Sequence, residues 1–300
     1  MGRLSKLLIL GLLALPMQAV AQGRETKVFK ATSAWAVDYG DDYCQLMRDF
    51  SDGTDPVGLL IQRTQPGPIM RMIVIGDSIR LFRGSQEVGF RMAPSGSSRT
   101  VPRLRYVTNT GDQYLNLGPT TLADMPTAAP GAPPPMPPPY TRQADVAAAG
   151  QITGVALTHG VTSPILIETG ALGEATDALQ ACADDLLASW GLDAEKHKGL
   201  RRPATPDRPS AGWIARDTVS FSDFTKLAGG NNELRVMVNA AGRATACHVL
   251  WPTLGEETNR TICDAVMENG TFLPALDQAG QAMDSYWMTS VFFLMPPFGS

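Results

Sequence analysis

One serine of the chain stands where a nucleophile could be presented. Ser78 follows an apolar run at 73–75 and the pair Gly76-Asp77, a pattern typical of a buried strand that ends in an exposed turn. A serine becomes a nucleophile only when a base takes its proton and a carboxylate orients that base. The candidate bases are three histidines, all far from Ser78 in sequence: His159, His197 and His248.

Residues 73–78 resemble the nucleophile block of GDSL-type hydrolases. That family supplies its base in an Asp-x-x-His sequence, whereas here the residues three positions before the histidines are Ala156, Ala194 and Thr245. The chain also lacks a Gly-x-Asn-Asp block for the oxyanion. We therefore interpret 73–78 as a strand and a turn and expect no catalytic residue. A GDSL-like serine esterase or hydrolase at Ser78 is kept as the alternative function.

The first residues predict the compartment. Arg3 and Lys6 precede an apolar run at 7–15, and an Ala-Val-Ala sequence ends at Ala21; these are the parts of a secretory signal peptide. The apolar run is less than half of the roughly 20 residues that a membrane-crossing helix needs, which argues against an uncleaved anchor. We predict a cleaved signal peptide at 1–21 and a periplasmic protein without stable membrane insertion.

Four cysteines are the other reactive side chains: Cys44, Cys182, Cys247 and Cys263. An even number in an exported chain indicates two disulfides, for which three connectivities exist. Cys182 belongs to an apolar helical stripe, so a bond from Cys44 would join that helix to the β-rich part; two separate buried thiols are the alternative. No Cys-x-x-Cys spacing occurs and only His248 adjoins a cysteine, so we expect no metal and no cofactor.

The patterns that position these residues predict an α+β fold in two domains. Short apolar runs separated by Gly, Pro, Asp and Ser make the N-terminal domain, 22–200, β-rich; the runs are 57–61, 70–75, 79–82 and 88–92. Its one long helix is expected at 174–190, where apolar residues recur every three or four positions. Seven prolines predict an exposed loop at about 127–140. A proline-containing linker at 201–215 then leads to a C-terminal domain.

The C-terminal domain, 216–300, shows two strands, a helix and a final strand in its sequence. Apolar residues alternate at 234–239 and 244–250, which predicts two paired strands. An apolar face predicts a helix at 256–268, and a last strand is expected at 286–295.

This ββαβ order resembles the C-terminal domain of TonB-type energy transducers over about 222–296. The segments that carry the resemblance are Asn-Ala-Ala-Gly-Arg at 239–243, Phe-x-Pro-Ala at 272–275 with Asp277 and Gly280 after it, and the final strand. The resemblance implies a TonB-like ββαβ fold and a protein-binding role. A subset of exported members also has one cysteine in the second strand and one in the helix, which implies a bond between Cys247 and Cys263. A cleavable signal in place of a membrane anchor means that coupling to the proton gradient is not carried over.

The last strand is the predicted binding site. A three-stranded sheet has two edges, and an exposed edge can accept another strand. The stretch 286–294 contains no proline and no charge, so we expect it to pair with an extended partner segment or with a second copy of the chain. Coverage by the N-terminal domain or by the tail at 296–300 is the alternative. The residues of this edge are Tyr286, Trp287, Met288, Thr289, Ser290, Val291 and Phe292.

The expected function is non-catalytic binding of a protein partner in the cell envelope, such as a segment of an outer-membrane receptor, as an accessory to TonB-dependent outer-membrane transport. An envelope scaffold without a transport role has the same sequence features. The formal net charge is −4 and the sequence has no basic run, which argues against nucleic acid as a partner.

Overall fold

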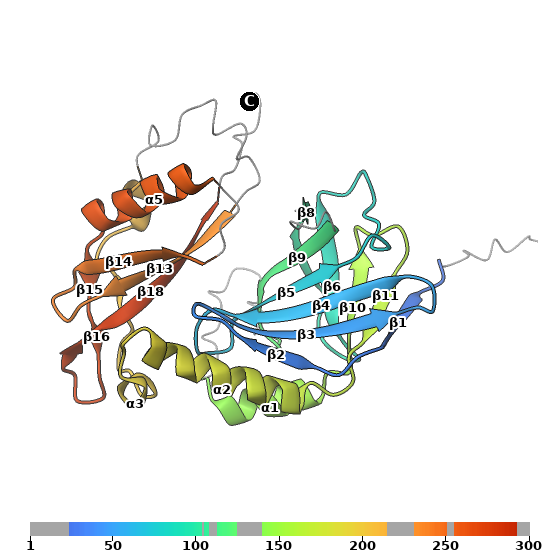
Figure 1. Ribbon diagram of the computed structural model, residues 1–300, viewed down its shortest axis with the longest axis horizontal. Coiled ribbons are helices and arrows are strands. Elements are labelled where there is room, and N and C mark those ends of the chain that lie inside the picture. Colours follow the sequence, from blue (N-terminus) through green and yellow to red (C-terminus); the bar gives the residue numbers. More distant parts are fainter. Residues whose placement is uncertain are drawn as a thin grey trace, which may run out of the picture.

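A computed structural model gives the structure of the chain (Figure 1), and it describes residues 24–103, 105–107, 113–124, 140–214, 231–250 and 255–292. The predicted signal peptide, the proline-rich stretch at 127–139 and the tail after 292 lie outside these ranges. Among the described residues, no helix combines the length and the apolar character that crossing a membrane requires.

The N-terminal part forms one large sheet, here called the barrel, which curls into a nearly closed, barrel-like shape (Figure 1). Its strands are β1 (Lys27–Ala31), β2 (Ala36–Tyr39), β3 (Cys44–Ser51), β4 (Pro56–Arg63), β5 (Met70–Ile75), β6 (Glu87–Ala93), β7 (Arg99–Pro102), β8 (Arg105–Val107), β9 (Gln113–Thr120), β10 (Gly154–His159) and β11 (Ile165–Glu168). The strand order is β7-β6-β10-β11-β1-β3-β4-β5-β9-β8, and β2 pairs with β3 beside this path. Of these pairings, β1 with β11 is parallel and the others are antiparallel.

Alternation along the strands fills the barrel with apolar side chains. In β4 the side chains of Val57, Leu59 and Ile61 enter the core at every second position. Large side chains from the other strands complete the same core: Phe29, Leu46, Phe50, Met72, Phe90, Leu117 and Leu157.

Side chains hold the two ends of the barrel sheet together. Arg99 of β7 donates from Nη1 to Thr120 Oγ1 of β9 at 2.6 Å, and from Nη2 to Asp124 Oδ1 at 2.8 Å. The terminal strands are also short, since β7 has four residues and β8 has three. The barrel therefore exposes little unpaired strand edge.

Helices α1 (Arg142–Gly150) and α2 (Gly173–Ser189) lie along one end of the barrel, and the short α3 (Ala194–His197) follows them (Figure 1). The predicted apolar stripe of α2 is confirmed, because Leu179, Cys182 and Leu186 are buried in the barrel core. Cys182 forms a disulfide with Cys44 of β3, with 5.9 Å between their Cα atoms. This pairing is the one expected from the sequence.

A buried ion pair fixes these helices to the barrel. Arg63, fully buried at the end of β4, contacts Asp145 of α1 with 2.6 Å between Nη2 and Oδ2, and it donates to the carbonyl of Gly67. Gln180 of α2 donates to the same Asp145 oxygen at 3.0 Å and to the hydroxyl of Tyr140. Because an unpaired buried charge is costly, the network resists separation of α1 and α2 from the barrel.

The C-terminal part forms a second, smaller core. Its elements are β12 (Thr205–Pro206), a 3-10 helix (Ser210–Gly212), β13 (Asn231–Val238), β14 (Ala244–Val249), α5 (Glu256–Asn269), β15 (Phe272–Leu273), β16 (Ala275–Leu276), β17 (Ala282–Met283) and β18 (Ser285–Phe292). Strands β14-β13-β18, in this order, make what we call the C-terminal sheet. Helix α5 lies over one face of it (Figure 1), and a disulfide joins Cys247 of β14 to Cys263 of α5.

The predicted fold class is wrong. The sequence predicts an α+β fold with a β-rich domain, one long helix and a TonB-like ββαβ domain, whereas the described residues are mostly β, with a nearly closed barrel and four α-helices. Between α5 and β18 the chain forms three further short strands, of which β15 pairs with β12 from before β13. Two-residue strands are too short to produce an alternation pattern, so the sequence could not show them.

Two further segments differ from their sequence patterns. The apolar run at 79–82 forms no strand, and Leu81 makes only an isolated bridge to Val161. In the proline-containing stretch at 201–214, Ala204 and Trp213 are buried in the C-terminal core. Proline composition alone does not distinguish an exposed linker from a segment that packs.

Candidate partner-binding site

Strand β18 is an edge of the C-terminal sheet. It pairs with β13 over all eight of its residues, from Ser285 opposite Val238 to Phe292 opposite Asn231, without a register shift. No other described strand pairs with β18. Among the described strands, β18 therefore lies at the end of the sheet, and its outer backbone groups point away from β13. Leu294 and the tail at 296–300 lie outside the described residues.

The two faces of β18 meet different parts of the molecule. Trp287 points into the C-terminal core, with 5.5 Å between its ring centroid and those of both Trp213 and Phe272. Tyr286 points to the opposite face and meets Trp190, at the end of α2, with 5.1 Å between centroids. Burial raises the pKa of the Tyr286 hydroxyl to about 12, against an opposing effect of the Arg235 charge. Both aromatic side chains are therefore packing residues rather than an exposed platform.

The two halves of β18 differ in their hydrogen bonds to described residues outside β13. His197 Nε2 of α3 lies 3.1 Å from Ser285 Oγ, and the imidazole stacks near Tyr286. From Met288 onward, the described residues make no hydrogen bond to β18 except across β13. In this later part Ser290 is exposed, and Met288, Thr289 and Val291 are half-buried.

The other two histidines, His159 and His248, lie on separate strands and form no cluster with other described titratable residues that could hold a metal ion. His159 is exposed at the end of β10, and His248 is exposed on β14. Desolvation by neighbouring groups, and then the charge of Arg235, lower the pKa of His248. In the part of the chain that the structure describes, no three His, Cys, Asp or Glu side chains lie close enough together to hold a metal ion.

Ser78 lies in a polar hollow of about 440 Å³. The lining residues are Lys27, Asp55, Asp77, Ser78, Arg80, Thr162, Ser163 and Ile165. They include no histidine, and the buried Ser78 hydroxyl has no hydrogen-bond partner among the described residues. A nucleophilic serine needs a base within hydrogen-bond reach, so nothing in this hollow favours the hydrolase alternative.

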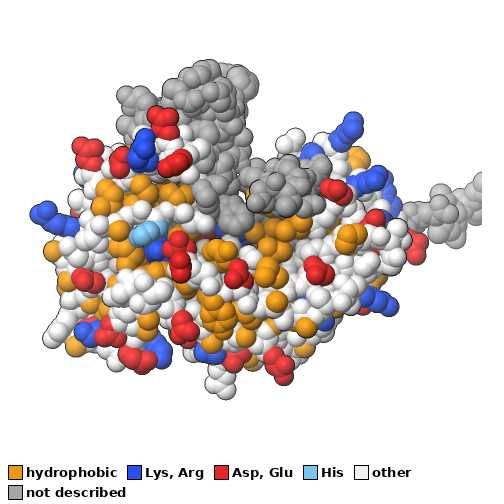
Figure 2. Space-filling view, viewed as in Figure 1, with side chains coloured by type: hydrophobic (Ala, Val, Ile, Leu, Met, Phe, Trp, Pro, Cys, Tyr) orange, Lys and Arg blue, Asp and Glu red, His pale blue; other side chains and the backbone are white. Residues whose placement is uncertain are grey.

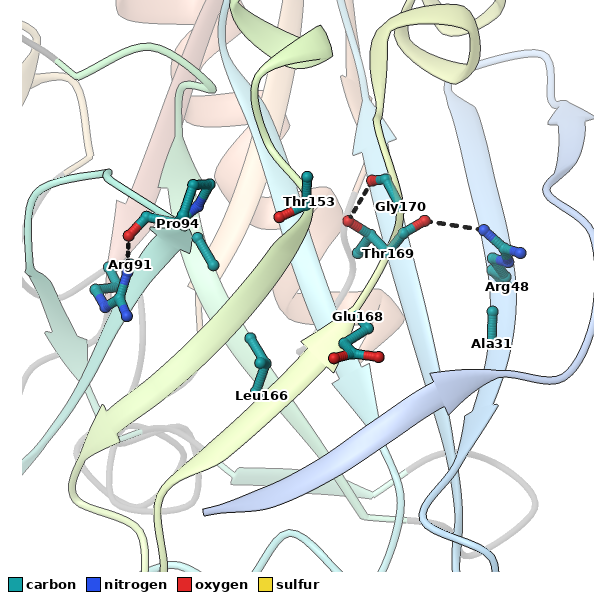
Figure 3. Close-up of a pocket in the computed structure, with 10 residues that line it drawn as sticks. Ala31, Arg48, Arg91, Pro94, Thr153, Leu166, Glu168, Thr169 and Gly170 are labelled. Atoms are coloured by element: carbon teal, nitrogen blue, oxygen red, sulfur yellow. Dashed lines mark hydrogen bonds between the residues drawn. The ribbon is translucent and has the colours of Figure 1, made fainter.

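A second hollow, of about 640 Å³, is lined by residues of β6 and β11, by the last residue of β1 and by Arg48 in the middle of β3 (Figure 3). Arg91 and Arg48 stand on opposite sides of it, with Glu168 between them. Each arginine donates to a backbone carbonyl, Arg48 to Thr169 at 2.9 Å and Arg91 to Pro94 at 2.6 Å. A small-molecule site needs polar groups that converge on one ligand position. These charges do not converge, so we assign no ligand to this hollow.

On the face shown in Figure 2, acidic and basic groups are interspersed and no continuous basic area appears. The large apolar side chains most exposed among the described residues come from separate elements: Tyr39, Ile69, Phe82, Tyr140 and Leu273. Among the described strands, β18 in contrast offers a backbone edge that no other strand pairs with.

Comparison with known proteins supplies no relative: no family model, no curated protein and no solved structure matches the chain. Two residues that contact the start of β18, Trp190 and His197, could not be predicted from the sequence. Trp190 was identified only as part of a helical stripe, and no local signal indicates that its ring meets a strand almost a hundred residues later.

Proposed function

We propose that this chain is a non-catalytic binding protein of the cell envelope, and that β18 accepts an extended segment of an envelope protein as an added strand. The observation that carries the proposal is the eight-residue edge strand Ser285–Phe292, which contains no proline and no charged residue. Edge strands of soluble proteins usually carry such residues to prevent pairing. Because β18 lacks such residues, it can pair with a further strand.

The envelope setting has independent support. Both disulfides fit an oxidising compartment, since such bonds persist outside the cytosol. The sequence resemblance to TonB C-terminal domains suggests the more specific form of the proposal, an accessory role in outer-membrane transport with a receptor segment as the partner. A scaffold without a transport role would use the same edge for a different envelope protein.

Proline substitutions at neighbouring positions test the edge. N–H groups along a strand alternate between its two sides. One of Thr289→Pro and Ser290→Pro therefore removes an N–H directed at β13, and the other removes an outward N–H. We expect the outward variant to keep its stability and both disulfides but to lose at least tenfold in affinity for the partner. The partner is first identified by cross-linking in envelope extract, and affinity is then measured with its synthetic extended segment.

The matched control is the other edge of the same sheet, where Thr245→Pro and Ala246→Pro make the same change in β14. These variants should bind as the wild type does if they fold. Unchanged binding by the outward β18 variant would exclude the edge as the binding site. A homodimer that only this variant disrupts would assign the edge to a second copy of the chain instead.

A further inference from the structure

The C-terminal sheet meets the barrel through two opposite charges on one face of β13. Glu233 and Arg235 are two residues apart, so both side chains leave the strand on the side opposite α5. Leu234 and Val236, the alternate residues, are buried in the C-terminal core. One strand thus presents an acid and a base together to the barrel.

Arg235 is clamped between a carboxylate and an indole. Its Nη2 donates to Asp42 Oδ1 at 2.8 Å, and its guanidinium lies 4.0 Å from the centre of the Trp190 ring. The indole N–H of Trp190 donates to the carbonyl of Asp41 at 3.3 Å. The Cys44–Cys182 disulfide holds both sides of this clamp, because Asp42 precedes Cys44 by two residues and Trp190 follows Cys182 by two helical turns.

Glu233 makes the reverse pairing. Its carboxylate forms an ion pair with Arg71 of β5 and accepts from Thr64 Oγ1 at 2.6 Å. The C-terminal sheet therefore offers an acid to a barrel base and a base to a barrel acid. This crossed arrangement fixes the orientation of the sheet, since a reversed approach would bring like charges together.

Contact with the barrel buries Arg235 without giving every N–H of its guanidinium a hydrogen-bond partner. The Arg235 side chain is 3% exposed, and its Nε and Nη1 have no hydrogen-bond partner among the described residues. Burial without partners disfavours a charged group, and burial lowers the pKa of Arg235 although Asp42 opposes this. Asp42 itself is 43% exposed, so water competes for its carboxylate. Attraction and desolvation thus oppose each other within one contact.

We propose that these contacts form a reversible latch: the C-terminal sheet docks on the barrel through Glu233 and Arg235, and it undocks when the charge pairs are weakened. In the docked state, Trp190 and His197 cover the start of β18 through Tyr286 and Ser285. Undocking uncovers that part of the strand and lengthens the accessible edge. The latch itself does not depend on the identity of any partner.

Small-angle X-ray scattering measures the equilibrium between docked and undocked states. The sample is the chain without residues 1–21, and NaCl is varied from 20 mM to 500 mM because salt screens the charge pairs. We expect the radius of gyration of the wild type to rise with salt. Asp42→Lys, which sets two cations side by side, should give the expanded value already at low salt. Glu233→Gln removes the carboxylate that pairs with Arg71, so undocking should occur at a lower salt concentration than in the wild type.

Asp264→Lys is the matched control, because it makes the same charge change at an exposed residue of α5, on the side of the C-terminal sheet that faces away from the latch. It should follow the wild-type curve. Far-UV circular dichroism and non-reducing peptide mapping confirm folding, and Asp42→Asn replaces Asp42→Lys if the latter fails to fold. The latch is excluded if Asp42→Lys or its substitute scatters as the wild type does at every salt concentration, or if Asp264→Lys expands equally.

Discussion

The barrel and the C-terminal sheet treat their strand edges in opposite ways. The barrel nearly closes on itself, ends in strands of four and three residues, and joins its ends through Arg99. The C-terminal sheet has three strands and leaves β14 and β18 at its edges, with six and eight residues. In the same chain, therefore, one sheet avoids strand addition and the other permits it. This difference supports the proposal that the C-terminal sheet accepts a partner strand.

The disulfides give the largest predicted difference between the two parts. Cys44–Cys182 spans 138 residues and Cys247–Cys263 spans 16. By the chain-entropy estimate, loss of the longer bond costs about 5 kcal/mol and loss of the shorter about 3 kcal/mol. Urea unfolding of the double variants Cys44→Ala/Cys182→Ala and Cys247→Ala/Cys263→Ala measures both. Equal losses would show that the two parts gain similar stability from their bonds.

The buried pair at the barrel end should have the next largest effect. Asp145→Ala leaves the fully buried Arg63 without a carboxylate, which we expect to cost about 3–5 kcal/mol in the free energy of unfolding. Asp177→Ala removes an exposed ion pair with Arg142 on the same helices and should cost under about 1 kcal/mol. Similar losses in the two variants, measured in urea, would contradict the assigned role of the Arg63–Asp145 pair.

Alkaline pH should destabilise the C-terminal sheet through Tyr286. Its folded-state pKa is raised to about 12, whereas an unfolded chain releases this proton near pH 10. Stability from this group is therefore present below about pH 10 and is lost as the pH rises toward about 12, by up to about 2–3 kcal/mol. Thermal unfolding from pH 9 to 12 should show a flatter decline for Tyr286→Phe. Parallel curves for variant and wild type would disprove the effect.

Local patterns in the sequence identified the elements with strong periodicity. The stripe through Leu179, Cys182 and Leu186 predicted α2, and the uncharged stretch from Tyr286 predicted an edge strand. Helix α1 was missed, because its residues are mostly small and carry no apolar stripe; Thr141, which accepts from the backbone N–H of Ala144, was its one local signal.

The contacts that assemble the barrel and dock the C-terminal sheet could not be predicted. Arg63 meets Asp145, 82 residues later, and Arg235 meets Asp42, 193 residues earlier. A charged residue in a single sequence shows no sign of its distant partner, and most such residues are solvated. The same limit explains the wrong fold class, since closure of the barrel depends on pairings between distant strands.

The parallel pair of β1 and β11 sets an order of events for the growing chain. β1 is the first of the barrel strands along the chain, yet it pairs with β11, the last of them. When the chain is made from its N-terminus, β1 therefore lacks its second partner strand until Ile165–Glu168 has been made. Contacts between segments so distant in sequence form slowly. During that interval the unfinished barrel has a long open edge, and we expect its yield to depend on how fast the rest of the chain is delivered.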